Sequence, residues 1–321
     1  MGLSERDKVL ISIPLFWSYG AVNALVAVLS HGAAMVLQQQ FEPAGAIQLI
    51  EKFKATALYT LPAMTNALLA EPSFSPDKTK SLRTGLTIGA PQDVMRAANE
   101  LGANEICNIY GQTESYGNCS VTPHTWPLER RAHCQGPPLP GVTIRIVNLE
   151  TGELSDDGEI GEIQVSGYLT PGYSGQSAIH NRAVFTEDGF FRTGDLGSLN
   201  PDGTVFYAGR SSEMIKRSGI NVSPAEVEEA LQQDETVGLA GVSGVPDADK
   251  GEIIVAFVVP RPGASTDAVN LRNHCKHLLS SYKLPDLIFF VSELPLTPTG
   301  KLMRRELKTL AAKAVADGGT A

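Results

Sequence analysis

The sequence predicts an α/β protein with a large α/β domain, a β-rich subdomain at the end of that domain, and a small α+β domain at the C-terminal side. Three observations support this prediction. Strand-like and helix-like runs alternate up to about Val147, short strands joined by glycine and proline turns follow from Val142, and a new helix start appears at Ser223. Alternating strands and helices are typical of a layer built on a mostly parallel sheet.

The first part of the chain supplies the elements of this layer. We expect strands at Val9–Ile13, Ala57–Leu61, Leu86–Ile88 and Ile106–Ile109, and helices at Ala44–Phe53 and Asp93–Leu101. Another stretch, Gly20–Leu37, is apolar but contains Asn23 and His31, and it barely reaches the length that spans a bilayer. We therefore expect a buried helix there and no membrane span.

The remaining elements divide between the β-rich subdomain and the small domain. The subdomain is expected to contain strands at Thr143–Val147, Glu159–Val165 and Gly203–Tyr207. In the small domain Ser223, Pro224 and Glu226 are spaced as in a capping box with proline at the first helical position, which predicts a helix. Strands at Gly238–Val242, Ile253–Val259 and Leu287–Val291 and a helix at Asp267–Ser281 are expected to complete the domain.

Composition excludes some classes of protein. The 321 residues carry a net charge of −9, which argues against a surface for nucleic acid or anionic membrane. The four cysteines are scattered and form no Cys-x-x-Cys pair, which indicates a reducing compartment rather than a disulfide framework. Residues 1–8 do not resemble the start of a signal peptide, so a cytoplasmic location is expected.

Two polar loops follow strands of the predicted large domain. Tyr110-Gly111-Gln112-Thr113-Glu114 comes directly after a strand, where a hydroxyl beside a carboxylate suits a phosphate oxygen and Mg²⁺. Phe191-Arg192-Thr193-Gly194-Asp195 ends in a carboxylate that can accept hydrogen bonds from ribose hydroxyls. Either loop by itself is more often an ordinary surface turn.

Two further segments lie at the start of the small domain and near its end. Residues 209–219 contain Arg210, Lys216 and Gly219, and residues 298–305 place Lys301 after a glycine. A lysine on such a loop can provide a mobile positive charge, although a solvated basic terminus has the same composition. His274-Cys275-Lys276-His277 offers at most an incomplete metal site, and an exposed helix face is the expected alternative.

Together, these motifs in this order resemble the adenylate-forming (AMP-binding) superfamily, which includes acyl-CoA synthetases, adenylation domains and luciferases. The resemblance covers nearly the whole chain, from Pro14-Leu15-Phe16 to Arg305. It implies that residues 1–210 are part of a large AMP-binding domain. It also implies that residues 211–321 are the small C-terminal lid domain, with a hinge at Ser212.

The resemblance also implies a role for each matching residue. Catalytic roles fall to Lys301, which would reach the α-phosphate, to Thr113 on the same phosphate, and to Glu114 as the Mg²⁺ ligand. The cofactor-binding residues would be Gly89, Ala90, Pro91, Tyr110, Asp195, Arg210, Lys216 and Gly219. Among these, Tyr110 would lie against adenine, Asp195 and Arg210 at the ribose, and Gly219 in the thiol tunnel.

The sequence departs from the family at three places. Ser212 stands where a charged hinge residue is usual, and Trp17 stands where a histidine is frequent, either as a gate to the acyl pocket or as core packing. No Ser/Thr/Gly-rich loop with a lysine precedes Pro14, and no G-x-x-x-x-G-K-[ST] motif occurs elsewhere. We therefore expect a chain that lacks the N-terminal part with the β- and γ-phosphate loop.

The implied activity is that of an acyl-CoA synthetase, an AMP-forming acid–thiol ligase. It would use ATP, Mg²⁺ and a fatty or other carboxylic acid to form an acyl-adenylate, and coenzyme A to form the thioester. A carrier-protein pantetheine is an alternative acceptor. Two other interpretations remain open, namely a non-catalytic nucleotide-binding remnant and one half of a split adenylating enzyme.

Overall fold

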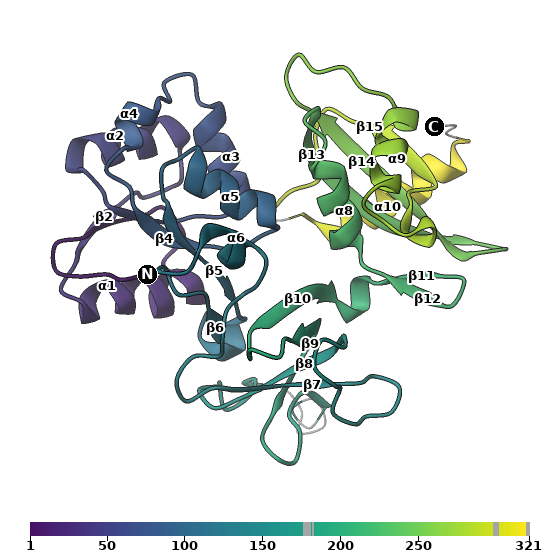
Figure 1. The fold of residues 1–321 in the computed structure, drawn as a ribbon, viewed down its shortest axis with the longest axis horizontal. Helices are drawn as coiled ribbons and strands as arrows, with labels where there is room; N and C mark the ends of the chain where they lie inside the picture. The colour runs from purple at the N-terminus through teal and green to yellow at the C-terminus, as the bar shows by residue number, and fades with distance from the viewer. Residues whose placement is uncertain (176–180, 182, 298–301, 319–321) are drawn as a thin grey trace. The chain divides into compact units, whose positions relative to one another are not determined.

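The computed structural model describes residues 1–175, 181, 183–297 and 302–318. The chain separates into two compact units, Met1–Tyr207 and Ala208–Ala321, coloured purple to teal and green to yellow in Figure 1. Each unit has hydrophobic cores of its own. The functional division expected between residues 210 and 211 remains a prediction.

The first unit is built on a six-stranded sheet with the order β2-β1-β3-β4-β5-β6. Its strands are β1 (Lys8–Ile11), β2 (Ala34–Leu37), β3 (Ala57–Tyr59), β4 (Thr84–Thr87), β5 (Glu105–Tyr110) and β6 (Ser120–Val121). The first five pair in parallel, and β6 is antiparallel to β5. The predicted α/β layer with a mostly parallel sheet is confirmed.

Helices connect these strands. They are η1 (Ser18–Leu25, a π-helix), α1 (Val26–Ser30), α2 (Pro43–Phe53), α3 (Pro62–Ala70), α4 (Pro76–Thr79), α5 (Pro91–Asn99) and α6 (Leu128–Ala132). The sheet is buried on both faces, because Val9 and Ile11 of β1 enter one core cluster and Leu10 enters another. Burial on both faces explains why β1 and β3 consist largely of consecutive apolar residues.

The apolar stretch Gly20–Leu37 differs from the expected buried helix. It is helical only as far as Ser30 and then forms β2 at the edge of the sheet. Val26 and Leu29 are 54% and 61% exposed, so one side of this helical segment faces outward. Among the described residues, no helix combines the length and apolar character needed to cross a membrane.

A second, antiparallel sheet forms the predicted β-rich subdomain. It contains β7 (Thr143–Val147), β8 (Gly161–Ser166), β9 (Phe191–Leu199) and β10 (Val205–Arg210), in the order β10-β9-β8-β7. Its core includes Ile144, Ile163 and Val205 together with Tyr110 from the end of β5. Tyr110 therefore packs where the two sheets of the first unit meet.

The second unit has a five-stranded sheet covered by helices. The strands are β11 (Ile215–Arg217), β12 (Ile220–Val222), β13 (Val237–Asp247), β14 (Gly251–Pro260) and β15 (Leu287–Phe290), in the order β12-β11-β14-β13 with β15 beside β14. Helices α8 (Pro224–Gln232) and α9 (Ala268–Lys276) pack in one core cluster. Helix α10 (Arg304–Ala316) packs in the other, with Leu307 against Phe257. This is the expected α+β fold.

Two local predictions in the second unit were wrong. The Ser223 hydroxyl does not cap α8, because it donates to the carbonyl of Ala208 at 2.6 Å. Glu226, the expected second member of the capping box, instead pairs with Lys283 at 2.5 Å. Helix α9 ends at Lys276 rather than Ser281, and the amides of His277 and Leu278 bond to carbonyls three residues back, at His274 and Cys275, as in a tightened last turn.

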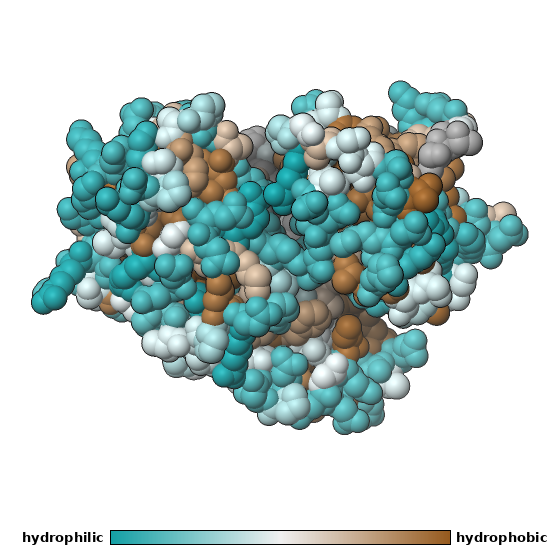
Figure 2. All heavy atoms as spheres, turned by 45° about the horizontal axis from the view of Figure 1, so that its top comes forward, coloured by the Kyte–Doolittle hydropathy of each residue, from teal (hydrophilic) through white to brown (hydrophobic). Residues whose placement is uncertain are grey.

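On the face drawn in Figure 2, hydrophilic residues predominate and apolar side chains form separate patches between them. Single exposed apolar side chains are normal on folded proteins and need no functional explanation.

Candidate active site

The polar loops of the first unit follow the carboxyl ends of β4 and β5. Residues 89–91 come after β4, and residues 111–115 come after β5. Since these strands are parallel neighbours, the two loops lie at the same edge of the sheet. Ligands of open α/β sheets bind at this edge.

The loop after β4 turns sharply into helix α5. Gly89 has φ of 138°, and a Cβ there would lie 2.6 Å from the Asp93 carboxylate and 2.9 Å from the Pro62 ring. The Ala90 amide donates to the same Asp93 carboxylate at 3.1 Å, and Pro91 is the first residue of α5. The structure thus explains why glycine, a small residue and proline follow one another here.

Tyr110, Gln112 and Asp195 form a hydrogen-bonded cluster between the two sheets. The Tyr110 hydroxyl donates to Asp195 Oδ2 at 2.9 Å, and Gln112 Nε2 donates to the same oxygen. Gln112 Nε2 also donates to the Thr193 carbonyl at 3.0 Å, and the Thr193 hydroxyl accepts from the Asp195 amide at 3.0 Å. The structure therefore joins two predicted site residues that lie 85 positions apart.

Burial controls the chemistry of this cluster. Asp195 is 3% exposed and Tyr110 is 6% exposed, and the Tyr110 ring stacks on Tyr207 with centroids 5.7 Å apart. Burial and the neighbouring Asp195 charge raise the pKa of Tyr110 well above its usual value. Tyr110 therefore stays protonated at neutral pH and acts as a hydrogen-bond donor to the carboxylate.

Thr113 and Glu114 lie in a short 3₁₀ turn, η2 (Thr113–Ser115), directly beyond this cluster. Glu114 Oε1 accepts a hydrogen bond from the Tyr173 hydroxyl at 2.6 Å, and its carbonyl accepts one from the Thr170 amide at 2.9 Å. The exposed Thr113 hydroxyl lies 3.4 Å from the Ser18 hydroxyl at the start of the π-helix. A hydroxyl and a carboxylate are therefore presented together on one turn.

This donor set fits Mg²⁺ only together with a phosphate ligand. Among the described residues, no group of three His, Cys, Asp or Glu side chains could hold a metal ion. Mg²⁺ is usually bound by one or two carboxylates plus substrate phosphates, rather than by a cage of protein ligands. A single half-buried carboxylate, Glu114, next to the Thr113 hydroxyl matches that requirement.

The other predicted residues belong to the second unit. Arg210 ends β10, Lys216 lies exposed on β11 with its amide bonded to Glu252, and Gly219 forms the hairpin turn between β11 and β12. Ser218 and Gly219 both have positive φ, at 49° and 81°, as a two-residue hairpin turn requires. Lys301 lies outside the described residues.

Sequence reasoning missed the residues that hold the predicted ones in place. Gln112 and Tyr207 contact the Tyr110–Asp195 pair, Tyr173 binds Glu114, and Ser18 contacts Thr113. Gln112 was within reach of the sequence argument, because it lies inside the loop motif. The contact of Tyr173 with Glu114 depends on residues 59 positions apart and has no local signal.

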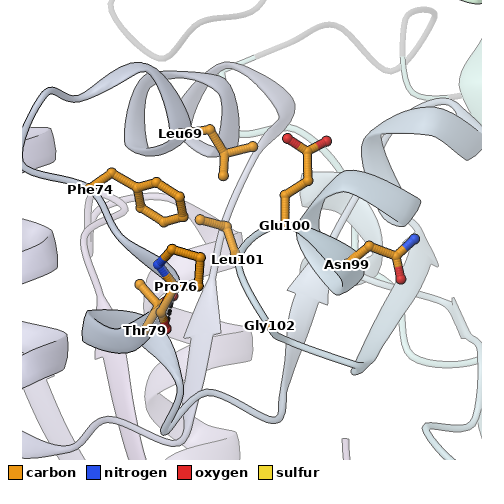
Figure 3. A pocket seen from close by; sticks show the side chains of 8 residues that line it. All are labelled: Leu69, Phe74, Pro76, Thr79, Asn99, Glu100, Leu101 and Gly102. Atoms are coloured by element: carbon orange, nitrogen blue, oxygen red, sulfur yellow. Dashed lines mark hydrogen bonds between the residues drawn. The ribbon is translucent and has the colours of Figure 1, made fainter.

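A pocket of about 350 Å³ lies elsewhere in the first unit, and Figure 3 shows its lining from α3, α4 and the end of α5. Leu69, Phe74 and Leu101 make it largely apolar, and Glu100 at its rim pairs with Arg96. Gly102, also in the lining, precedes the amino end of β5, whereas the site loops follow the carboxyl ends of the strands. The pocket is therefore separate from the candidate site.

The His274–His277 segment has an ordinary structural environment. His274 Nε2 lies 3.1 Å from the Ala230 carbonyl, and Cys275 is fully buried. Burial raises the pKa of the Cys275 thiol to about 11, which disfavours a metal-binding thiolate. These contacts place His274 and Cys275 in the packing between α8 and α9, whereas His277 is exposed.

Comparison with known protein families gives matches in both units. Residues 1–174 match the family described as AMP-binding enzyme. Residues 226–301 match the family described as AMP-binding enzyme C-terminal domain. The first match alone covers more than half of the 321 residues.

Individual proteins agree with these matches. A putative acyl-CoA synthetase from Bacillus subtilis is 34% identical over 312 residues, which are 96% of this chain and 57% of that protein. The crystal structure of ATP-bound MatB from Rhodopseudomonas palustris superposes with a TM-score of 0.86 at 28% identity, covering 96% of this chain and 61% of that one. The o-succinylbenzoate CoA synthetase of Bacillus subtilis, solved with its acyl-adenylate intermediate, gives a TM-score of 0.80 at 30% identity, covering 96% and 62%. The chain spans about half to two thirds of the length of the curated relatives it matches.

Proposed function

We propose, since this chain belongs to the AMP-binding enzyme family, that it works as part of a carboxylic acid–CoA ligase. The reaction would join a carboxylate to AMP with release of pyrophosphate and then transfer the acyl group to the thiol of coenzyme A. The names of the relatives support both steps, because they include acyl-CoA ligases and a CoA synthetase with bound acyl-adenylate. Coenzyme A is the favoured acceptor over a carrier-protein pantetheine for the same reason.

The observation that carries the proposal is the Tyr110–Gln112–Asp195 cluster beside the Thr113–Glu114 turn. A carboxylate has acceptor capacity for several donors, so Asp195 can receive ribose hydroxyls in addition to its protein donors. Tyr110 offers an aromatic ring at the same place for adenine. Adenine and phosphate would thus be bound by consecutive parts of the segment at and after the end of β5, and ribose by Asp195 of β9.

The Thr113–Glu114 turn is proposed to hold the phosphate end of the nucleotide. The Thr113 hydroxyl would donate to an α-phosphate oxygen, and Glu114 would hold Mg²⁺. When bound, Mg²⁺ would neutralise part of the phosphate charge. The turn itself contributes orientation, because Tyr173, Thr170 and Ser18 restrain it from two sides.

The second unit is proposed to complete each half-reaction. Arg210 would assist at the ribose, and Lys301 would stabilise charge growing on the α-phosphate. Lys216 would bind the cofactor, and Gly219 would line the thiol tunnel. The second unit has hydrophobic cores made of its own residues, which supports the proposal that it would move as one body. Gly219 needs its positive φ for the hairpin turn, so any substitution there would strain the turn. A bulky side chain would in addition narrow the proposed thiol tunnel.

A second candidate function is nucleotide binding by a chain that does not complete adenylation by itself. The observation that favours it is the lack of a Ser/Thr/Gly-rich lysine loop in the 321 residues. The two candidates differ in one assay, ATP–pyrophosphate exchange by the chain joined to a part that carries such a loop: exchange would be fast under the first candidate and absent under the second. The 321-residue chain alone is expected to give little exchange under either candidate. A cytoplasmic location is proposed in either case from the scattered cysteines.

Nucleotide binding tests the site directly, without knowledge of the acid. We expect AMP to bind the 321-residue chain in calorimetry. Asp195→Asn should weaken that binding about 10- to 100-fold, because charged hydrogen bonds contribute about 1.5–3 kcal/mol. The matched control is Asp202→Asn, an aspartate of the same unit that is exposed and pairs with Arg130. Equal AMP affinity in both variants would contradict the proposed site.

A further inference from the structure

Arg304, the first residue of α10, binds carboxylates from two other elements of the second unit. Its Nη2 lies 2.9 Å from Glu228 Oε2 of α8, and its Nη1 donates to Glu228 Oε1 and to the Val242 carbonyl. Its Nε lies 3.1 Å from Glu213 Oε2, in the turn η3 (Ser211–Glu213). The planar guanidinium thus uses its two sides for two different partners.

The ion pair between Arg304 and Glu228 stabilises the fold of the second unit. The Glu228 side chain is only 12% exposed, and its Oε1 also accepts the Val242 amide at 2.7 Å. Burial raises the pKa of Glu228, and Arg304 partly offsets that effect. Without Arg304 a buried carboxylate would lack its cation, which is strongly destabilising.

The ion pair between Arg304 and Glu213 is not needed to stabilise a buried charge. Glu213 is 29% exposed, so water could solvate its carboxylate without Arg304. Its negative charge also lies near Glu228 and disfavours the ionised form of that residue. The contact is therefore not needed to satisfy a buried group, and its effect is to connect the 211–213 turn to the start of α10.

The two residues directly before Arg304 contact residues 295–296. The Met303 amide donates to the Pro295 carbonyl at 2.8 Å, and Leu296 and Leu302 form an antiparallel bridge. Residues 298–301, which include Lys301, lie outside the described residues. In the sequence, Lys301 comes directly before Leu302 and three positions before Arg304.

We propose that Arg304 is a positioning residue whose ion pair with Glu213 fixes the 211–213 turn to the start of α10. This inference rests on the proposed function in one respect, the assignment of Lys301, three positions before Arg304 in the sequence, and of the hinge at Ser212. The neighbour Glu213 supplies the ionic contact that the uncharged Ser212 lacks. A rotation about the turn then carries the start of α10 with it, because the two are joined by a charged hydrogen bond.

Hydrogen exchange tests the link without any catalysis. In the 321-residue chain, Glu213→Ala should speed amide exchange about three- to fivefold in two separate peptides, residues 209–216 and residues 294–304. Glu213→Gln keeps an acceptor for Nε and should restore part of the protection. The matched control is Glu226→Ala, which removes a glutamate of the same unit that pairs with Lys283.

A response confined to residues 209–216, or an equal response in the Glu226 control, would overturn the proposal. A second variant, Arg304→Lys, keeps a cation for Glu228 but cannot reach both carboxylates, so adding Glu213→Ala to it should change the exchange of residues 294–304 no further. Additive effects would also overturn it.

A catalytic readout separates this inference from the proposed function. In a preparation that completes both half-reactions, Glu213→Ala should lower kcat for adenylation by about three- to tenfold and leave the KM for ATP unchanged. In that preparation, coupled exchange with no effect of Glu213→Ala on kcat would support the link and count against the proposed role of Lys301. A lowered kcat with uncoupled exchange would do the reverse.

Discussion

Asp7 shows how a single buried carboxylate contributes to the first unit. It is 3% exposed and accepts hydrogen bonds from Arg83 Nη2 at 2.9 Å, Thr56 Oγ1 at 2.7 Å and the Ser4 amide at 2.8 Å. Burial alone would raise the pKa of Asp7, but the bonds from Arg83, Thr56 and Ser4 outweigh it and leave the pKa below its usual value. Ionised Asp7 therefore stabilises the fold.

We predict that Asp7→Asn lowers the free energy of unfolding of the first unit by about 1–3 kcal/mol at pH 7. Because the folded pKa lies below the model-peptide value of 3.8, this contribution is complete above pH 4 and is lost as the pH falls through the folded pKa. The difference between the native protein and the variant should therefore shrink below pH 4.

Tryptophan fluorescence in urea measures this effect, because Trp17 and Trp126, the two tryptophans of the chain, both lie in the first unit. Asp77→Asn serves as the control, since its pair with Lys80 is exposed and 3.7 Å long. A difference that stays constant from pH 7 to pH 3 would mean that charge is not the cause.

At the same scale, site residues differ in how far the sequence predicts them. Tyr110, Glu114 and Asp195 could be named because each lies in a short motif, but their roles come only from the family resemblance. The sequence does not show that Tyr110 donates to Asp195, since that contact joins two loops 85 positions apart. Their partners Tyr173 and Tyr207 lie outside every motif and are found by the fold alone.

Helix α8 shows what decides the start of an element. Its sequence has the composition of a capping box, yet Ser223 donates its hydroxyl proton to the Ala208 carbonyl. The serine is buried, and this bond ties the helix entry to the first residue of the second unit. A tertiary hydrogen bond has here replaced the local one that the pattern predicts.

We predict that Ser223→Ala and Ser223→Asp both destabilise α8, by about 1–2 kcal/mol for alanine and at least as much for aspartate. Aspartate is a good N-cap but cannot donate to a carbonyl, so the two roles predict opposite results for this variant. The measurement is hydrogen exchange of residues 224–232. Native-like protection in Ser223→Asp would support capping and contradict the donor role.

Elements with strong periodicity were predicted well, and those that depend on tertiary contacts were not. Strand β7 has the expected bounds, and α2 begins one residue early, at a proline with Glu42 accepting the first amides. The prediction of a single buried helix for Gly20–Leu37 was wrong, because apolar composition cannot distinguish a helix from the edge strand that follows it. The early end of α9 depends on a turn at Cys275 that no composition signal marks.

For the whole molecule, the sequence predicted the arrangement in layers because each part has its own pattern. Continuous apolar strands such as Val9–Ile11 indicate a sheet buried on both faces, whereas Thr143–Val147 alternates as an antiparallel strand does. The order of strands within each sheet could not be predicted, because β1 lies between β2 and β3 by long-range pairing alone. The Lys301 segment stays a sequence-based prediction.

Lys301→Ala is the variant that tests the molecule as a two-step enzyme. Lys301 is proposed to meet negative charge that grows on the α-phosphate, an interaction stronger in the transition state than in the ground state. We therefore predict adenylation slowed by about 10²–10³-fold, a loss of about 3–4 kcal/mol, with little change in substrate affinity. Thioester formation from a synthetic acyl-adenylate and coenzyme A should be nearly unchanged, because rotation of the second unit would by then have removed Lys301 from the phosphate.

The control is Lys308→Ala, which removes the same charge from an exposed lysine of α10. The measurement is the rate of each half-reaction in a preparation that completes both. Equal impairment of the two steps would mean that Lys301 acts on the structure of the second unit and that the half-reactions do not use different positions of that unit.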